Sequence, residues 1–368
     1  MNGFLGERIS RCICKVFPAA FQRQRISLMD GASVENMVKN EQQADSEITL
    51  NKVIDLWIMS SSTKHKRSTN STYKTVADRH IRPALGTFTI GEITSVVLTE
   101  YIRDKACGSG EERALAPSTV CSIITVLRSV LRYAESMGYA VKGMDVLDRP
   151  KLMTGETEIL STPAQKQLET ELLQELDFEK LGVLVCLYTG LRIGEICALK
   201  WGDISIDTGT LTVRRTVQRI KNSEHAILEG GNRTILVFDA PKSKTSCRTI
   251  PLSTFLVELL RENRCDADCY LLTGDSVVFI EPRTFQNRFK RILKQASLPD
   301  MNFHALRHTF ATNCIDLGVD PKTLSQILGH ADVSVTLNTY VHPSLSKMRA
   351  CMELLGSNRE SVYCQNTE

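Results

Sequence analysis

One stretch near the carboxyl end, residues 302–343, constrains this chain most because it joins four polar groups to helical patterns. It reads NFHALRHTFATNCIDLGVDPKTLSQILGHADVSVTLNTYVHP. Residues three apart share one face of a helix, so His304 and Arg307 should project to the same side. His330 follows an apolar segment that ends in glycine, and Tyr340 comes ten residues later. The stretch predicts helices that gather a cation, two imidazoles and a phenol.

This set of side chains indicates phosphate chemistry more than metal binding. An arginine, two histidines and a tyrosine form no usual metal site, whereas a phenol can attack a phosphodiester while cations hold the non-bridging oxygens. The cysteine pairs Cys12/Cys14 and Cys265/Cys269 lack a partner pair or histidines at zinc spacing. We therefore expect reduced thiols, no metal and no cofactor.

Composition is that of an ordinary globular protein with room for two or three domains. The 368 residues are 42% hydrophobic and 24% charged. A net charge of +3 does not by itself indicate nucleic acid, so the distribution of charge must decide. The start of the chain lacks a signal-peptide pattern and no apolar run reaches about 18 residues, which favours a cytoplasmic protein.

The first half predicts a small all-helical domain over residues 44–139, followed by a linker over 140–158. The basic residues 1–43 fit either a DNA-contacting arm or a loosely ordered leader, and we favour the leader. The polar, basic run 60–68 is a loop or helix start that could contact DNA. Four helices are expected: from Thr49, around Thr72 with a stop near Pro83, from Ser95 with a Ser or Thr cap, and from Pro117 to Gly138.

The second half predicts a mixed domain over residues 159–343. A Thr-Pro helix start lies at Thr162, and a buried helix from 178 ends at Gly190. Strand-like segments then flank turns, before further helices and a final helix with its tail over 344–368. The strands are expected at 211–220, 234–238 and 248–252, and the helices at 254–264 and 282–296. The fold class is mainly α with a small antiparallel β-sheet.

Four motifs in order resemble the tyrosine recombinases, also called phage integrases. They are TGLRIGE at 189–195, PKSKTSCRTIPL at 241–252, HALRHTFAT at 304–312 and LGHADVSVTLNTY at 328–340. One such motif is weak evidence, but four in this order are specific. The resemblance covers about residues 47–345 and is nearest in style to integrases of Gram-positive phages and conjugative transposons.

The resemblance implies a catalytic set. It places the family's active-site residues on Arg192, a lysine of the strand turn, His304, Arg307, His330 and Tyr340. The turn offers Lys242 and Lys244, and we prefer Lys242 because the Pro-Lys-Ser/Thr form recurs in this branch. Glu195 would support the arginine turn. We interpret His308 as structural, and Tyr363 is a rival phenol in a polar tail.

The resemblance also implies a mechanism on DNA. Tyr340 would form a 3′-phosphotyrosyl link, the arginines would hold the phosphate and His330 would hydrogen-bond it, without ATP or metal. Lys242 would protonate the departing 5′-oxygen, and His304 would accept the phenol proton. The expected function is integration or excision of a mobile element. Alternatives are Xer-type dimer resolution, or a DNA-binding protein that has the fold without the chemistry.

The implied partners are double-stranded recombination sites and further copies of the chain. A helical core-binding domain and an α+β catalytic domain would form a clamp on DNA. The basic helix at 282–294 should approach the duplex. The apolar stripe of the last helix should dock on a neighbour in a synaptic homo-tetramer, and an excisionase or host architectural protein is a further expected partner. The stripe consists of Leu345, Met348, Met352 and Leu355.

Overall fold

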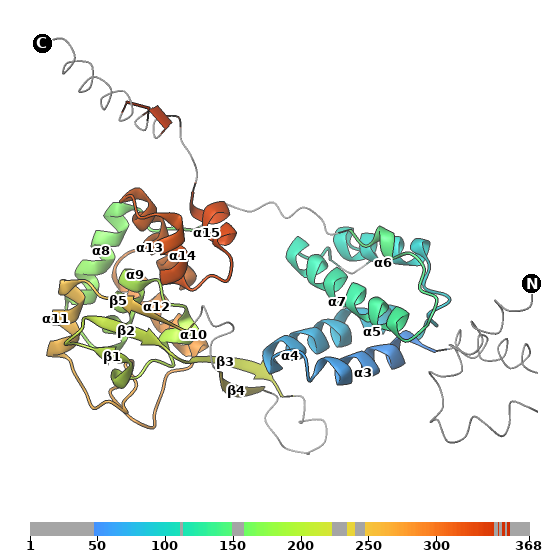
Figure 1. Ribbon diagram of the computed structural model, residues 1–368, viewed down its shortest axis with the longest axis horizontal. Coiled ribbons are helices and arrows are strands. Elements are labelled where there is room, and N and C mark those ends of the chain that lie inside the picture. Colours follow the sequence, from blue (N-terminus) through green and yellow to red (C-terminus); the bar gives the residue numbers. More distant parts are fainter. Residues whose placement is uncertain are drawn as a thin grey trace, which may run out of the picture. The chain divides into compact units, whose positions relative to one another are not determined.

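The computed structural model describes residues 48–110, 113–148, 158–222, 234–239 and 247–341, together with 345, 348–349 and 352–353. The leader 1–43, both candidate lysines (Lys242 and Lys244), Leu355 and Tyr363 lie outside the described residues. The chain divides into two compact units at residues 152 and 153, and each is described by itself (Figure 1). No helix in the described ranges is long and apolar enough to cross a membrane.

The first unit is helical, as the sequence predicts. Its elements are α3 (Leu50–Ser61), α4 (Arg67–Val76), the π-helical turn η2 (Ala77–Ile81), α5 (Arg82–Leu85), α6 (Ser95–Cys107), α7 (Pro117–Ser136) and the short 3-10 helix η3 (Met144–Val146). The predicted cap is confirmed, since the Thr94 side chain accepts a hydrogen bond from the backbone of Val97. Gly138, at φ +102°, follows the end of α7 as expected.

The predicted stop near Pro83 is two residues early. The helical path starts inside the basic run at Arg67 and continues through η2 into α5, which ends at Leu85. Pro83 lies in the first turn of α5, directly after the π-helical turn. A wider π-helical turn, η2, lies between α4 and α5. The chain therefore stays helical past Pro83 and leaves the helix after Leu85.

The core of the first unit lies between α7 and the helices around it. The predicted apolar stripe of α7 is buried, as are Leu50, Val53 and Ile54 of α3. Burial of each such side chain stabilises the fold by about 1.5–3 kcal/mol. Leu147, which lies in the predicted linker 140–158, is also fully buried in this core. Residues 149–157 of that linker are outside the described part of the chain.

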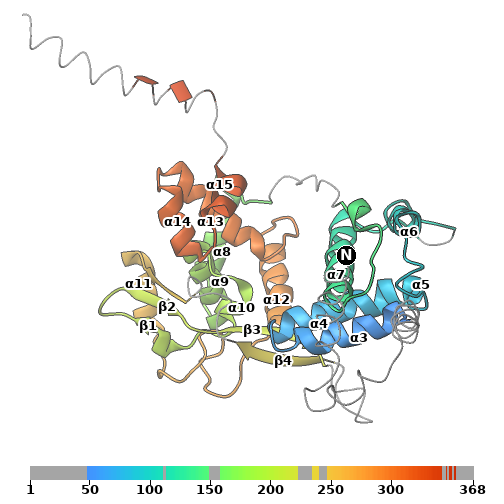
Figure 2. The ribbon, with the colours of Figure 1, turned by 45° about the vertical axis from the view of Figure 1, so that its right-hand side comes forward.

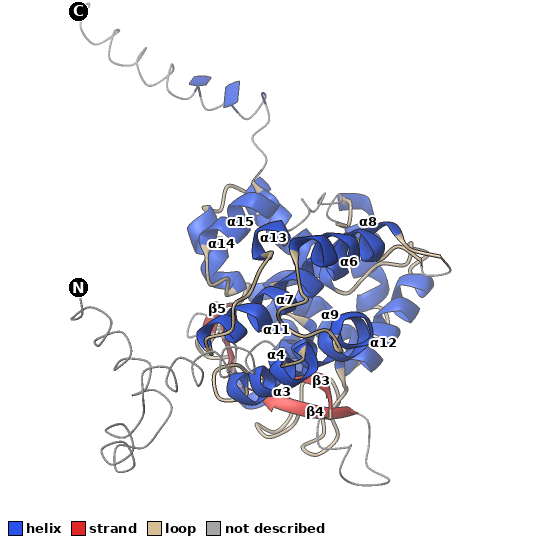
Figure 3. Cartoon of the chain, turned by 90° about the vertical axis from the view of Figure 1, so that its right-hand side faces the viewer, coloured by secondary structure: helices blue, strands red, loops and turns tan. Residues whose placement is uncertain are grey.

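The second unit is mainly helical, with short strands (Figure 3). Its helices are α8 (Thr162–Leu173), α9 (Phe178–Thr189), α10 (Ile193–Ile196), α11 (Thr254–Glu262), α12 (Pro282–Gln295), α13 (His304–Asp316), α14 (Pro321–Leu328) and α15 (Val333–Tyr340). Its strands are β1 (Ile204–Ser205), β2 (Thr210–Val213), β3 (Thr216–Lys221), β4 (Thr234–Asp239) and β5 (Arg248–Pro251). The helix α8 starts as predicted, although its cap is Ser161 rather than Thr162.

The strands form two small antiparallel sheets where the sequence predicted one. One sheet has the order β1-β2-β5, and β3 pairs only with β4 among the described strands. The predicted single strand 211–220 is wrong because the chain leaves the first sheet at Arg214 and Arg215. Both arginines form ion pairs with the buried carboxylate of Asp203. These pairs fix the break between β2 and β3.

Helix α9 is the centre of the second unit. Most of its residues are buried, and it contacts α8, α12 and α13. Figures 1 and 2 both show it between the β1–β2 sheet and the helices α13 to α15. Its carboxyl end therefore lies beside elements that follow more than a hundred residues later, which is where the candidate site forms.

Candidate active site

Two left-handed glycines prepare the site by ending helices. Gly190 after α9 and Gly329 after α14 have φ values of +65° and +67°. A Cβ at Gly190 would lie 2.6 Å from the ring of Phe310, and one at Gly329 would lie 2.9 Å from a guanidinium nitrogen of Arg248. Only glycine suits both the backbone and the space. The last carbonyls of both helices are left to accept side-chain donors.

The buried side chain of Arg307 donates hydrogen bonds to two of these carbonyls. Its side chain is among the largest fully buried ones, and the residue is 2% exposed. Its Nη1 donates to the Gly190 carbonyl at 2.7 Å and its Nη2 to the Leu328 carbonyl at 2.9 Å. Burial first, and then the charge of Arg192, lower the pKa of Arg307 to about 9. Among the described residues, no carboxylate forms an ion pair with it, which is unusual for a buried guanidinium.

Arg192 is held at the first turn of α10 by Glu195. Its Nη1 donates to Oε1 of Glu195 at 2.9 Å, and its Nη2 donates to the Gly329 carbonyl at 3.3 Å. The backbone N–H of Arg192 donates to the other oxygen of Glu195 at 3.0 Å. The guanidinium remains about one third exposed. The TGLRIGE motif therefore produces an arginine that is held by Glu195 and Gly329 while its side chain stays partly exposed.

Glu195 is shared with a second arginine, Arg248 at the start of β5. Arg248 donates to both oxygens of Glu195, at 3.1 and 3.0 Å, and to the carbonyl of Ile327. Burial acts to raise the pKa of Glu195, but the hydrogen bond and charge of Arg248 and the charge of Arg192 outweigh it, so this pKa lies below its ordinary value. Arg192 and Arg248 thus bond one carboxylate, and the charge of Arg307 lies close to it. The excess positive charge suits an anion, since each guanidinium has five N–H donors.

His330 connects Arg307 to the helix that carries Tyr340. Its Nε2 lies 2.8 Å from Nη2 of Arg307, and its Nδ1 lies 2.8 Å from Oγ1 of the buried Thr336. Because a guanidinium can only donate, Nε2 accepts and the ring proton is on Nδ1. Burial and the charges of Arg307 and Arg192 lower the pKa of His330 to about 4, so the imidazole is neutral near pH 7.

Tyr340 is the last residue of α15 and is 7% exposed. Its hydroxyl lies 2.8 Å from Nδ1 of His308. Burial raises the pKa of Tyr340, although the nearby charges of Arg307 and Arg192 oppose this. Asp332 caps α15 by accepting from the backbone of Ser334 at 2.8 Å, which fixes the start of the helix. The phenol is therefore protonated, confined and next to an imidazole.

The two histidines of α13 differ in their contacts. The rings of His304 and His308 meet edge to face at 4.6 Å. The residue His304 is exposed, yet partial removal of its ring from water and the charges of His308 and both arginines lower its pKa to about 4. In the described part of the chain, the imidazole bonded to the Tyr340 hydroxyl is that of His308, which the sequence interpretation set aside as structural. Its spacing of four residues from His304 already indicated a shared helix face.

The fold brings Arg192, His304, Arg307, His330 and Tyr340 together from separate elements. The candidate lysines Lys242 and Lys244 belong to the segment between β4 and β5, outside the described residues. No group of three or more His, Cys, Asp or Glu side chains that could hold a metal occurs in the ranges that the structure describes.

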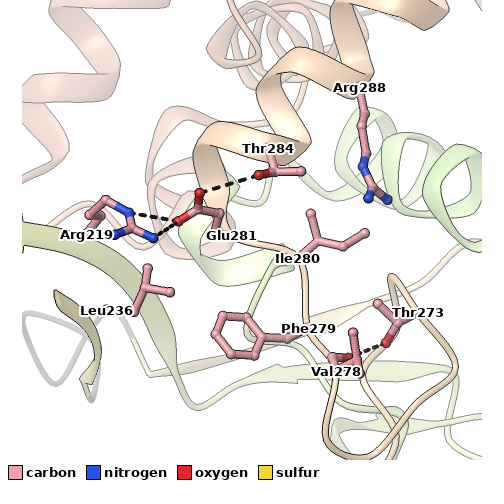
Figure 4. Close-up of a pocket in the computed structure, with 9 residues that line it drawn as sticks. All are labelled: Arg219, Leu236, Thr273, Val278, Phe279, Ile280, Glu281, Thr284 and Arg288. Atoms are coloured by element: carbon pink, nitrogen blue, oxygen red, sulfur yellow. Dashed lines mark hydrogen bonds and ion pairs between the residues drawn. The ribbon is translucent and has the colours of Figure 1, made fainter. Parts of the chain in front are cut away.

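A hollow of about 260 Å³ lies elsewhere on the second unit, between the β3–β4 hairpin and α12. Figure 4 shows Arg219, Glu281 and Arg288 among its lining residues. Its two arginines are already paired, Arg219 with Glu281 and Arg288 with Glu179. The hollow therefore lacks the excess positive charge of the arginine cluster and is separate from the phenol.

Comparison with known protein families agrees with this geometry. Residues 164–347, half of the chain, match the model of the phage integrase family. The chain belongs to the phage integrase family. Residues 49–106 match the N-terminal SAM-like domain of phage integrases. The match to the phage integrase family covers every described residue of the cluster.

Similar proteins include a tyrosine recombinase and a transposon transposase. A tyrosine recombinase XerC-like protein of Caldanaerobacter subterraneus subsp. tengcongensis is 29% identical over 261 residues, which are 63% of this chain and 64% of that protein. The transposase from transposon Tn916 of Enterococcus faecalis is 26% identical over 199 residues, which are 48% of this chain and 45% of that protein. The chain thus spans less than two thirds of the length of these relatives.

Solved structures share the fold. The Tn1549 transposon integrase in complex with transposon right end DNA has a TM-score of 0.67 at 21% identity, over 84% of this chain and all of that one. A lambda integrase dimer bound to a COC′ core site has a TM-score of 0.58 at 16% identity, over 83% of this chain and 81% of that one. The integrase-family chain therefore has the fold of these proteins.

Proposed function

We propose that this chain is a site-specific tyrosine recombinase that cuts and rejoins double-stranded DNA through a 3′-phosphotyrosyl intermediate. The observation that carries the proposal is a cluster of three arginines with one carboxylate, Glu195, which bonds two of them, beside a buried phenol. The excess positive charge fits a phosphodiester, and the phenol is a nucleophile that can form a covalent link to phosphorus. Membership of the phage integrase family supports the same reaction.

In the proposed reaction, the oxygen of Tyr340 attacks a phosphorus atom while Arg192 and Arg307 donate to the non-bridging oxygens. Negative charge grows on these oxygens in the transition state, so donors set in place beforehand act where they are most effective. Lys242, or Lys244, protonates the departing 5′-oxygen. The covalent link keeps the energy of the phosphodiester, so the reaction requires neither ATP nor a metal. Attack by the 5′-hydroxyl of another strand completes the exchange.

His330 has a defined part in the arrangement before DNA binds. With its proton on Nδ1, it accepts from Arg307 and orients that guanidinium. A direct hydrogen bond from His330 to a phosphate oxygen requires the proton on Nε2. We therefore propose that DNA binding exchanges the Arg307–His330 contact for contacts of both side chains with the phosphate.

The proposed biological role is the integration or excision of a mobile element by a homo-tetramer on two synapsed sites. Likeness to a transposon transposase and to the fold of a transposon integrase supports the mobile element. Leu345, Met348 and Met352 are 79%, 46% and 68% exposed, which supports docking of the final helix on a neighbouring copy. An excisionase or host architectural protein could assist, and the cytoplasm is the proposed compartment. Deletion of residues 344–368 should abolish synapsis, and intact synapsis would contradict the docking.

The reaction can be tested before the recombination site is identified. A library of nicked duplexes with a randomised segment is incubated with the protein, and DNA that survives denaturing washes is recovered. The wild type and Tyr363→Phe should capture a defined sequence covalently, and Tyr340→Phe should capture none. Covalent capture of DNA by Tyr340→Phe would overturn the assignment of Tyr340 as the nucleophile. A wild type that binds duplexes but never captures one would favour a DNA-binding protein without catalysis.

The XerC-like relative supports a second candidate, resolution of chromosome or plasmid dimers. The captured sequence separates the two functions. A mobile-element integrase should recover the junction of an element's ends, whereas a dimer resolvase should recover a single chromosomal or plasmid site. Recombination between two copies of the recovered sequence on one plasmid then measures the activity directly.

A further inference from the structure

The Tyr340 hydroxyl has an imidazole partner that the sequence interpretation did not assign to the reaction. Tyr340 is the last residue of α15, and its hydroxyl lies 2.8 Å from Nδ1 of His308 on α13. His304 is hydrogen-bonded through its own backbone to Asn302, and no hydrogen bond joins its ring to Tyr340 in the described residues. We propose that His308 accepts the proton of Tyr340 during cleavage, an inference that rests on the proposed recombinase function.

The protonation of His308 sets the direction of its hydrogen bond with Tyr340. The proposed role requires the O–H of Tyr340 to donate to Nδ1 of His308, which is then the unprotonated ring nitrogen. The nearby charge of Arg307 acts to lower the pKa of Tyr340 against the effect of burial, and so favours loss of the phenol proton. Burial and the charge of Arg307 lower the pKa of His308, so its imidazole is neutral near pH 7.

The groups around His308 favour proton transfer only during the reaction. Before DNA binds, burial and the charge of Arg307 disfavour a charged imidazole at this position. A bound phosphate adds negative charge beside Arg307 and offsets that repulsion. His308 can therefore become an imidazolium at the stage when the phenol must lose its proton. The edge-to-face contact with His304 holds the ring in the required orientation.

The atoms balance in both directions. As the Tyr340 oxygen bonds to phosphorus, its proton moves to Nδ1 of His308, the bond from phosphorus to the 5′-oxygen breaks, and that oxygen takes a proton from the lysine of the strand turn. During rejoining, the incoming 5′-hydroxyl returns its proton to the lysine and His308 returns its proton to the departing phenolate. A base and an acid on opposite sides of the phosphorus are expected for an in-line exchange.

The first test uses the duplex captured by the wild type and a second version with sulfur in place of the bridging 5′-oxygen. A thiolate leaves without protonation, so cleavage of the sulfur duplex reports mainly on activation of Tyr340. His308→Asn keeps an acceptor near the position of Nδ1 but cannot take a proton. We expect it to slow covalent capture by about 10²–10⁴-fold on both duplexes. Lys242→Ala should instead recover on the sulfur duplex, and Lys244→Ala is measured beside it.

The outcomes separate this role from positioning and from folding. His308→Asn at the wild-type rate, or recovery of His308→Asn on the sulfur duplex, would overturn the proposal. Unfolding midpoint and duplex affinity are measured for each variant, so that a rate loss counts only where both are retained. If His308→Asn loses stability or duplex affinity, the test is instead the rate of single-turnover covalent capture by the wild type, measured as a function of pH. On the sulfur duplex the rate should fall as pH drops through one ionisation, and a flat profile would contradict a histidine base.

A second arm needs no DNA. Nitrogen NMR of ¹⁵N-histidine-labelled protein should show Nδ1 of His308 without a proton, with a signal that shifts in Tyr340→Phe. A proton on Nδ1 would overturn the proposal. If the wild type captures no duplex, the recombinase function fails and the base role fails with it. If the wild type captures DNA and His308→Asn matches it, only the base role fails.

Discussion

Arg248 and Arg307 are both buried in the second unit, but they are held in opposite ways. Arg248 donates to both oxygens of Glu195, so its charge is neutralised inside the protein. Arg307 donates to two carbonyls and His330 and has no carboxylate partner among the described residues. A buried charge is costly unless it is paired. On this difference we propose that Arg248 is part of the scaffold and that an external anion serves as the partner of Arg307.

The largest expected effect comes from removing the charge of Glu195, the carboxylate that bonds Arg248. Glu195→Gln removes the buried negative charge that Arg248 and Arg192 share and should lower the free energy of unfolding by about 3–5 kcal/mol. Urea unfolding measures this loss. The matched control is Glu281→Gln, whose partner Arg219 is 41% exposed, and it should cost at most about 1 kcal/mol. Equal losses in both variants would remove the distinction between the two arginines.

On the anion side, Arg307→Lys keeps a positive charge but loses the planar fork that reaches two carbonyls and a phosphate. We expect the rate of covalent capture to fall by about 10²–10³-fold. The rate is measured on the duplex captured by the wild type, with circular dichroism to confirm folding. Arg288→Lys, at an arginine paired with Glu179, is the control and should change the rate far less. A normal rate in Arg307→Lys would show that the fork is dispensable.

Inorganic phosphate should bind the cluster and stabilise the wild type. At ten times its dissociation constant, a ligand that binds only the folded state adds about 1.4 kcal/mol. The thermal midpoint should therefore rise with phosphate, while Arg307→Lys should respond weakly. Sodium chloride at matched ionic strength controls for general screening. If phosphate raises the thermal midpoint of Arg307→Lys as much as that of the wild type, the phosphate binds at a site that does not include Arg307.

The last expected effect concerns the dependence of stability on pH. In the folded protein the pKa of His330 is about 4, below the ordinary value of 6.5 that applies to the unfolded chain. Above pH 6.5 neither state takes up a proton, so the full stability is present there. Between pH 6.5 and about 4 the unfolded chain binds more protons, so stability falls as pH falls. Urea midpoints over this range should show the slope, and His330→Gln should reduce it. A wild type without a slope would contradict the neutral, buried His330.

The sequence predicted the helices well because their signals are local. Caps, first-turn prolines and glycine ends specify where α6, α7 and α9 begin or end, and the apolar stripe of α7 specifies its buried face. It failed where long-range pairing decides. The run 211–220 has uniform strand character, yet ion pairs to Asp203 divide it between two sheets. Such a break depends on a side chain from another element, which no local pattern contains.

By itself, the sequence determined the residue types of the site and the order of its motifs, because glycine, arginine, histidine and tyrosine are required by backbone conformation and chemistry at those positions. Only the tertiary structure decided how they are used. Arg307 donates a hydrogen bond to a carbonyl that lies 117 residues away in the sequence. Tyr340 is hydrogen-bonded to His308, 32 residues away, and not to His304. A hydrogen bond depends on distance and direction to within a fraction of an ångström, and packing of α9, α13, α14 and α15 sets both.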